Sequence, residues 1–184
     1  MSFKNVVSKS ELLNEKKELH ATEVVDRILS TKKDVLIQKL SEKTDEAVES
    51  VAKYLASLSE AYKAFQRLYL ELGDEQLELL SRAQEGRLEI SAGRARFMDI
   101  NYTVINGYQA SWMLPSTSSI FDFFNRGRDL IESLAKAAWT RNLVLKIIKD
   151  LKDTDRLMNA IERIAIPELR ERISYLSLKQ TLSN

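Results

Sequence analysis

Side chains that could carry out chemistry are few in this chain of 184 residues. His20 is the single histidine and cysteine is absent, so the nitrogen and sulfur ligands of a familiar transition-metal site are missing. Carboxylate pairs such as Asp122 with Asp129 are expected by chance at this acidic content, and no apolar pocket pattern surrounds them. We therefore expect no metal, no cofactor and no catalytic residue, and the chain is not predicted to be an enzyme.

The glycines also argue against a nucleotide-binding loop. Such a loop needs closely spaced glycines followed by Lys and then Ser or Thr, because backbone N–H groups must surround the phosphates. The five glycines are Gly73, Gly86, Gly93, Gly107 and Gly127, and none has that spacing. The chain is not expected to hydrolyse nucleotide by itself.

The charge balance argues against nucleic acid or an anionic membrane surface as the main partner. The 28 basic side chains nearly cancel the 27 acidic ones, so no strong long-range field exists. No run of 18 uncharged apolar residues occurs, and the first nine residues do not resemble a secretion signal. The sequence therefore favours a soluble, cytoplasmic protein without direct membrane insertion, and the lack of cysteine fits a reducing compartment.

Two long tracts with helical periodicity make up most of the chain and must position any residues that bind a partner. From Glu11 to Leu72 no Gly or Pro interrupts the first tract, and a helix of about 60 residues would reach roughly 90 Å. The second tract begins near Asp129 and contains one proline, Pro167, at which we expect a bend. Apolar residues at heptad spacing predict the seam of a two-helix coiled coil. The predicted seam residues are Val51, Leu55, Leu58, Tyr62, Phe65, Leu72, Leu134, Leu145, Ile148, Leu151 and Met158.

A short middle segment separates the two tracts. Gly73-Asp74 predicts a kink, and the alternating residues between Arg87 and Ile105 predict a small β-hairpin. The stretch from Asn106 to Ser119, with its Gly, Pro, Ser and Thr, predicts an irregular loop. The expected fold is therefore mainly α: a helix over 1–84, a hairpin and loop over 85–119 and a helix over 120–184, with the two helices antiparallel.

Two motifs at opposite ends of the chain carry a family resemblance. Residues 156–162 read Arg-Leu-Met-Asn-Ala-Ile-Glu, residues 166–169 read Ile-Pro-Glu-Leu and residues 173–176 read Ile-Ser-Tyr-Leu. Near the other end, residues 29–36 read Leu-Ser-Thr-Lys-Lys-Asp-Val-Leu. These segments resemble the terminal signatures of the D subunit of V-type and archaeal-type rotary ATPases and ATP synthases. The matching residues are Lys32, Asp34, Leu36, Arg156, Asn159, Ala160, Glu162, Ile166, Pro167, Leu169 and Tyr175.

The resemblance implies a central rotor shaft that carries torque between a catalytic ring and a membrane ring that moves protons or sodium ions. It implies four partners: the catalytic A and B subunits, the F subunit of the central stalk, and the funnel-shaped subunit (C/d) above the membrane ring. It also implies a cytoplasmic position at the membrane periphery. The concentration of aromatic residues between Tyr54 and Leu72, opposite Leu134 to Ile148, favours that region as the contact for the F subunit.

Other classes of protein remain open at this stage. A stalk protein of flagellar or type III export also enters an ATPase ring, although it usually lacks a long hairpin segment between its helices. A self-associating scaffold or membrane-remodelling helical hairpin would need a pronounced basic face, which the charge balance does not indicate. An enzyme is the least favoured class.

Overall fold

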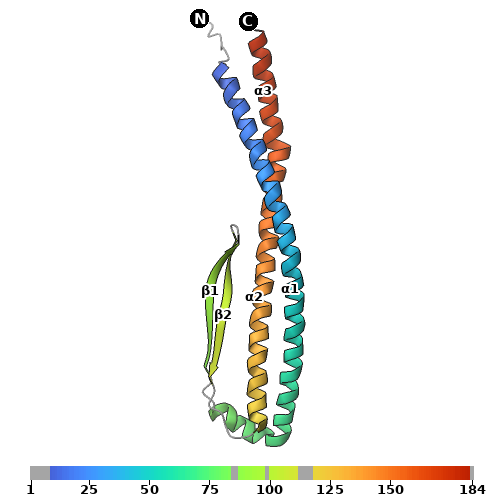
Figure 1. Cartoon of the computed structure of the whole chain (residues 1–184), viewed down its shortest axis with the longest axis vertical. Helices are drawn as coiled ribbons and strands as arrows, with labels where there is room; N and C mark the ends of the chain where they lie inside the picture. The colour runs from blue at the N-terminus through green and yellow to red at the C-terminus, as the bar shows by residue number, and fades with distance from the viewer. Residues whose placement is uncertain (1–8, 84–86, 98–99, 112–117, 183–184) are drawn as a thin grey trace. The chain divides into compact units, whose positions relative to one another are not determined.

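The computed structural model describes residues 9–83, 87–97, 100–111 and 118–182 (Figure 1). Helix α1 covers Lys9–Ala83, strands β1 and β2 cover Arg87–Phe97 and Ile100–Ser111, and helix α2 covers Ser118–Ala160. The second helical tract continues through a π-turn, η1 (Ile161–Ala165), into helix α3 (Ile166–Thr181). The predicted fold class, two long helical tracts with a β-hairpin between them, is confirmed.

The packing divides the chain into two units. Unit 1 contains Met1–Lys39 with Ile148–Asn184, and unit 2 contains Leu40–Ile147. In unit 1 an ion pair joins Glu23 to Arg170, and another joins Lys33 to Asp155. From the first ion pair to the second, the residue number rises along α1 and falls along the second tract, so the two helices of this unit are antiparallel. The division of the chain at residues 84 and 119 stays a prediction.

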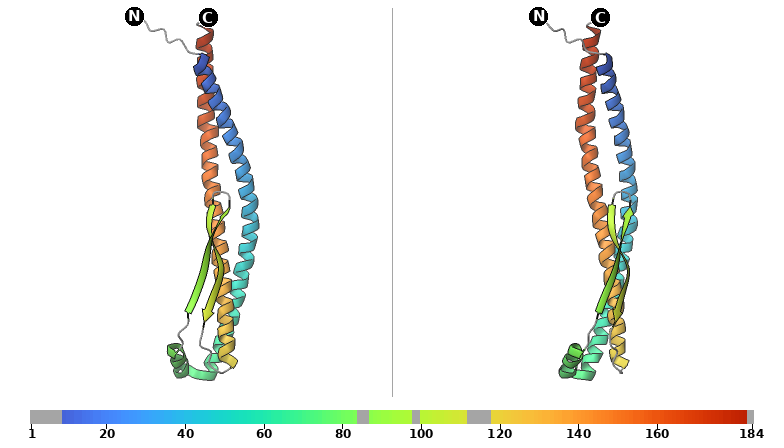
Figure 2. Two further views of the ribbon diagram at one scale, coloured as in Figure 1. Left: turned by 60° about the vertical axis from the view of Figure 1, so that its left-hand side comes forward. Right: turned by 90° about the vertical axis from the view of Figure 1, so that its left-hand side faces the viewer.

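Unit 2 holds the hairpin and the predicted kink. Strands β1 and β2 pair antiparallel and twist about each other (Figure 2). The register pairs Ser91 with Gly107 but Ala92 with Ile105, so Asn106 is an extra residue and forms a bulge. The predicted loop from Asn106 is thus wrong as far as Ser111, because cross-strand pairing continues past the bulge. Residues 112–117 of that loop lie outside the described residues, and its last two residues, Ser118 and Ser119, belong to α2, so the prediction is wrong there as well.

The kink in α1 lies at Gly73, where φ is 71° and ψ is 176°. A residue with a Cβ rarely adopts this backbone conformation, so Gly73→Ala should lower the free energy of unfolding by about 1–3 kcal/mol, although no atom lies within 4 Å of the added Cβ. Gly127→Ala is the matched control, since Gly127 lies inside α2 in similarly open space, and it should raise stability by about 0.5–1 kcal/mol. Urea denaturation of both variants checks the prediction; equal effects would show that the Gly73 backbone carries no strain.

Candidate interaction site

The buried face of α1 in unit 2 is built largely from small side chains. Ser50, Ala61, Ala64 and Leu68 are at most 6% exposed, and on α2 a buried row begins with small side chains and ends with larger aliphatic ones. That row contains Ser133, Ala137, Thr140, Leu143 and Ile147. Small side chains let two helix backbones approach closely.

The buried hydroxyl groups in this interface need no partner from the opposite helix. Ser50 Oγ donates to the carbonyl oxygen of Ala47 at 2.9 Å, and Ser133 Oγ donates to that of Leu130 at 2.9 Å. Thr140 Oγ1 donates to the carbonyl oxygen of Lys136 at 2.8 Å. Each of these three hydroxyls is satisfied within its own helix, so none of them requires a partner on the opposite helix.

Most of the predicted seam in unit 2 does not face the opposite helix. Val51, Leu55, Leu58 and Tyr62 are 41–61% exposed, and Leu134 and Leu145 are about half exposed. Phe65 is the exception on α1, because its ring reaches Phe123 of α2 although its side chain is 40% exposed. Leu72, Ile148, Leu151 and Met158 are half-buried. On α1 the buried row lies one residue before the predicted seam. The prediction from heptad spacing selects large apolar side chains, whereas the interface buries mainly alanine and serine.

The exposed seam residues of α1, together with Val48 and Tyr69, form a second apolar row on this helix, which we call the α1 ridge. Successive members are three or four residues apart over six steps, which is the spacing of a coiled-coil seam. The α1 ridge comprises Val48, Val51, Leu55, Leu58, Tyr62, Phe65 and Tyr69, which are 40–66% exposed. An exposed apolar row of this length is typical of a surface that another protein covers.

Aromatic side chains extend one end of the α1 ridge toward the kink. The Phe65 ring lies 5.9 Å from that of Phe123, and the Phe123 ring lies 5.6 Å from that of Phe124. These rings line a cavity of about 490 Å³ together with Leu77 and Leu80, which follow Gly73. A hydrogen bond to the Asp74 carboxylate, with its negative charge, raises the pKa of Tyr69 above its ordinary value.

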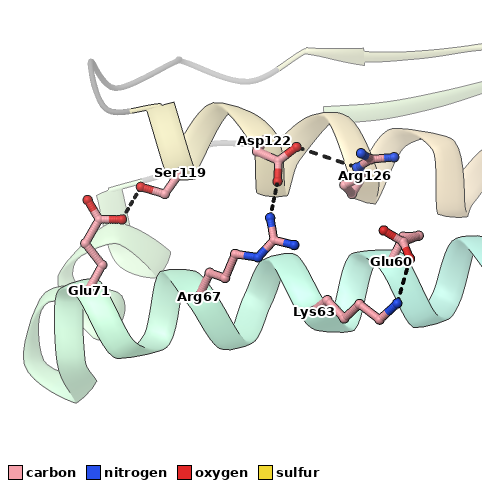
Figure 3. A network of polar contacts seen from close by, with 7 residues as sticks. All are labelled: Glu60, Lys63, Arg67, Glu71, Ser119, Asp122 and Arg126. Carbon is pink, nitrogen blue, oxygen red and sulfur yellow. Dashed lines mark hydrogen bonds and ion pairs between the residues drawn. The ribbon is translucent and has the colours of Figure 1, made fainter.

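Polar contacts fix the two helices of unit 2 beside this cluster (Figure 3). Ser119 Oγ donates to a Glu71 carboxylate oxygen across the helices. The Asp122 carboxylate lies 3.8 Å from the Arg67 guanidinium on α1 and 3.5 Å from that of Arg126 on its own helix. These groups are largely exposed, so we expect them to define the helix register more than to add stability.

Unit 1 contains a cross-helix cluster of lysine and aspartate, consisting of Lys32, Lys33, Asp150, Asp155 and Asn159. Lys32 Nζ lies 3.1 Å from Asp150 Oδ2, with both side chains less than a quarter exposed. Lys33 Nζ lies 2.5 Å from Asp155 Oδ1, and Asn159 Nδ2 donates to the Asp155 backbone carbonyl at 2.8 Å. The hydrogen bond and charge of Lys33 lower the pKa of Asp155, and Asp155 raises that of Lys33, so this pair is charged at neutral pH.

The signature residues do not all meet at one place. The structure brings Lys32 and Asn159 into the lysine–aspartate cluster, buries Leu36 completely and buries Leu169 to 6% exposure. Ile166 is half-buried on the second tract. The others have exposed side chains: Asp34, Arg156, Ala160, Glu162, Pro167 and Tyr175. Sequence reasoning missed the partners Asp150 and Asp155, which are more than 100 residues from their lysines and carry no local signal.

The described part of the chain shows no grouping of side chains for metal-dependent chemistry. Within residues 9–83, 87–97, 100–111 and 118–182, no three His, Cys, Asp or Glu side chains gather to hold a metal ion. His20 is exposed on α1. No helix among the described residues combines the length and apolar character needed to cross a membrane.

Known proteins resemble the chain over most of its length. A sequence model of the family described as the D subunit of ATP synthase matches residues 11–179. The D subunit of the A-type ATP synthase of Thermococcus sibiricus is 24% identical over 178 residues, which are 92% of this chain and 83% of that protein. The D subunit of the V-type ATP synthase of Thermotoga neapolitana is 26% identical over 157 residues, 81% of this chain and 76% of that protein. A third relative, from Methanopyrus kandleri, is 22% identical and covers 94% of this chain and 77% of its own length.

Proposed function

We propose a working arrangement for this chain from the premise that it belongs to the family of ATP synthase D subunits and is a central-stalk subunit of a V/A-type rotary ATPase. In this proposal it transmits torque between the catalytic ring of A and B subunits and the membrane ring that translocates ions. The observation that carries the proposal is the family match across residues 11–179, which spans both helical tracts and the hairpin. Two paired helices resist twisting better than one, which suits a part that carries torque. The flagellar or type III export stalk is not favoured, because the relatives found are ATP synthase subunits.

Unit 1 is the part that we assign to the ring of A and B subunits. Several large apolar side chains on its outside are exposed, among them Val25 at 44%, Ile28 at 62%, Ile164 at 57% and Leu178 at 62%. Apolar contacts have no preferred direction, so such a surface can move past successive neighbours with small changes in energy. The lysine–aspartate cluster lies between the helices and would hold them together under load.

The α1 ridge is the surface that we assign to the F subunit. Its heptad spacing fits a third helix, because each exposed ridge residue can enter a hole formed by four residues of a neighbouring helix. The aromatic end of the ridge and the cavity beside the Gly73 kink suit the funnel-shaped subunit (C/d), since aromatic side chains contribute strongly to protein interfaces.

In this arrangement the chain is a non-catalytic subunit on the cytoplasmic side, peripheral to the membrane. Its own side chains supply packing and charge, and the partner subunits supply ATP chemistry. The choice between protons and sodium ions, and between synthesis and hydrolysis of ATP, belongs to those partners.

Purification of the tagged full-length chain from its native source tests the proposal. We expect A, B and F subunits to copurify in fixed ratios, and mass spectrometry identifies them. Recovery of the chain alone, or with components of an export apparatus, would remove the proposed role.

A further inference from the structure

The π-turn η1 widens the second helical tract just before Pro167. The backbone N–H of Ile166 donates to the carbonyl oxygen of Ile161, five residues back, whereas an α-helix would use the carbonyl of Glu162. Pro167 has no N–H, and in an uninterrupted α-helix its ring would meet the carbonyl of Arg163. The widened turn thus lies where the proline prevents the ordinary pattern.

Up to and including η1, one row of buried or half-buried residues on the second tract follows a heptad alternation, beside Asp155, which pairs with Lys33 of α1. This row comprises Leu151, Thr154, Met158, Ile161 and Ala165, all buried or half-buried. Steps of three and four residues alternate without exception along it. Continued through an ordinary α-helix, the same alternation would next bring four polar or charged residues to face α1. Those residues are Glu168, Arg172, Tyr175 and Lys179.

After η1, the buried row is displaced by one residue from that continuation. Leu169 is 6% exposed, and the half-buried residues that follow it continue the heptad spacing. The displaced row comprises Leu169, Ile173, Leu176 and Gln180. One residue is also the number that a π-turn adds to an α-helix. The widened turn therefore accounts for the displacement in both direction and size.

In the row that the π-turn removes from the interface, Glu168, Arg172 and Tyr175 are exposed and Lys179 is half-buried. The carboxylate of Glu168 lies 3.7 Å from the guanidinium of Arg172, and Lys179 Nζ lies 5.9 Å from the centre of the Tyr175 ring. In this register the exposed guanidinium of Arg170 lies 3.0 Å from the carboxylate of Glu23 on α1. The side chains of Glu162 and Arg163 are exposed, so water can reach the carbonyls that lose their α-helical donors.

We propose that η1 is a frame-shifting device, positioned by Pro167, that turns α3 so that Leu169, Ile173 and Leu176 pack against α1 in place of a charged row. Pro167 is thus a positioning residue for the end of the paired helices. This inference concerns the folding of unit 1 and does not depend on the proposed function.

Removing the extra residue and the proline together tests the proposal in the full-length chain. Deletion of Arg163 combined with Pro167→Ala should give a continuous α-helix with the same buried row, so the melting temperature should stay within about 3 °C of the parent value or rise. The matched control deletes the exposed residue Lys152 in the same Pro167→Ala background. The helix has no π-turn at that position, so nothing there offsets the loss of one residue. Its melting temperature should fall by more than about 5 °C, because the row from Thr154 to Ala165 leaves the interface.

Cysteine labelling reports which row is buried, since the chain contains no cysteine of its own. In the parent and in the Arg163 deletion, Leu169→Cys should react with a thiol reagent at least about tenfold more slowly than Glu168→Cys. Equal losses of stability in the two deletions, equal tolerance of both, or protection of Glu168→Cys in the parent chain would each overturn the proposal.

Discussion

Replacement of Leu68 by alanine is expected to lower the free energy of unfolding by about 3 kcal/mol, the middle of the range for buried leucine. Leu68 is 1% exposed and belongs to the buried row of α1 in unit 2, where most other members are alanine or serine. Leu68 also lines the cavity beside Phe123 and Phe124, so the lost methyl groups should enlarge a space that is already unfilled. The penalty therefore includes both the lost burial and the unfilled volume.

Leu70→Ala supplies the matched control for this prediction. Leu70 lies two residues further along the same helix and is 84% exposed, so its replacement should change the free energy of unfolding by less than about 0.5 kcal/mol. Urea denaturation followed by far-UV circular dichroism measures both variants, and equal slopes would show that the unfolded state is unchanged. A loss at Leu70 as large as that at Leu68 would contradict the assignment of the buried row.

The helices, the kink and the hairpin could be predicted because each depends on local chemistry. No Gly or Pro interrupts the helix between Glu11 and Leu72, and Gly73 can adopt a positive φ that other residues rarely adopt. Both signals affect the backbone only within a few residues, so they can be read from the local sequence. The strand beyond Asn106 is not predicted, because Gly107 is a loop signal in the sequence, whereas pairing with β1 accommodates this glycine in a bulged ribbon.

The buried seam in unit 2 could not be predicted from apolar periodicity, because α1 carries two rows of heptad spacing that differ by one residue. One row is large and apolar, and the other is mainly alanine and serine. Burial of large side chains would gain more per residue, yet close packing of two backbones favours the small ones. The choice depends on what else covers the large row, which the sequence of one chain does not contain.

The lysine–aspartate cluster shows the same limit for charged residues. Lys33 and Asp155 are each surrounded by other charges of no obvious function, and their pairing follows only from the antiparallel register. The π-turn could be predicted only in part from the sequence. Pro167 indicates an interruption, but only the buried position of Leu169 shows that the helix absorbs it by adding a residue to one turn. The bend at Pro167 stays a prediction.

Substitution on the α1 ridge is expected to weaken binding of the F subunit without destabilising the chain. The double variant Leu55→Ser with Tyr62→Ser should reduce affinity by about 3 kcal/mol, or roughly a hundredfold in Kd, because Tyr62 is the type of residue that dominates interfaces. Leu55 is 56% and Tyr62 61% exposed in this chain, so the free energy of unfolding should change by less than about 0.5 kcal/mol. Isothermal titration calorimetry with the purified F subunit measures the affinity.

Ile28→Ser provides the control for the ridge variant, because Ile28 is an apolar residue of the same helix with the same high exposure, 62%, but lies in unit 1. It should leave the affinity for the F subunit unchanged and instead reduce assembly with the A and B subunits, whose ring we assign to unit 1. Loss of F-subunit binding in the Ile28 variant with retention in the ridge variant would reverse the two assignments. Unchanged affinity in both would place the contact on another face, and the exposed heptad row would then need a different partner.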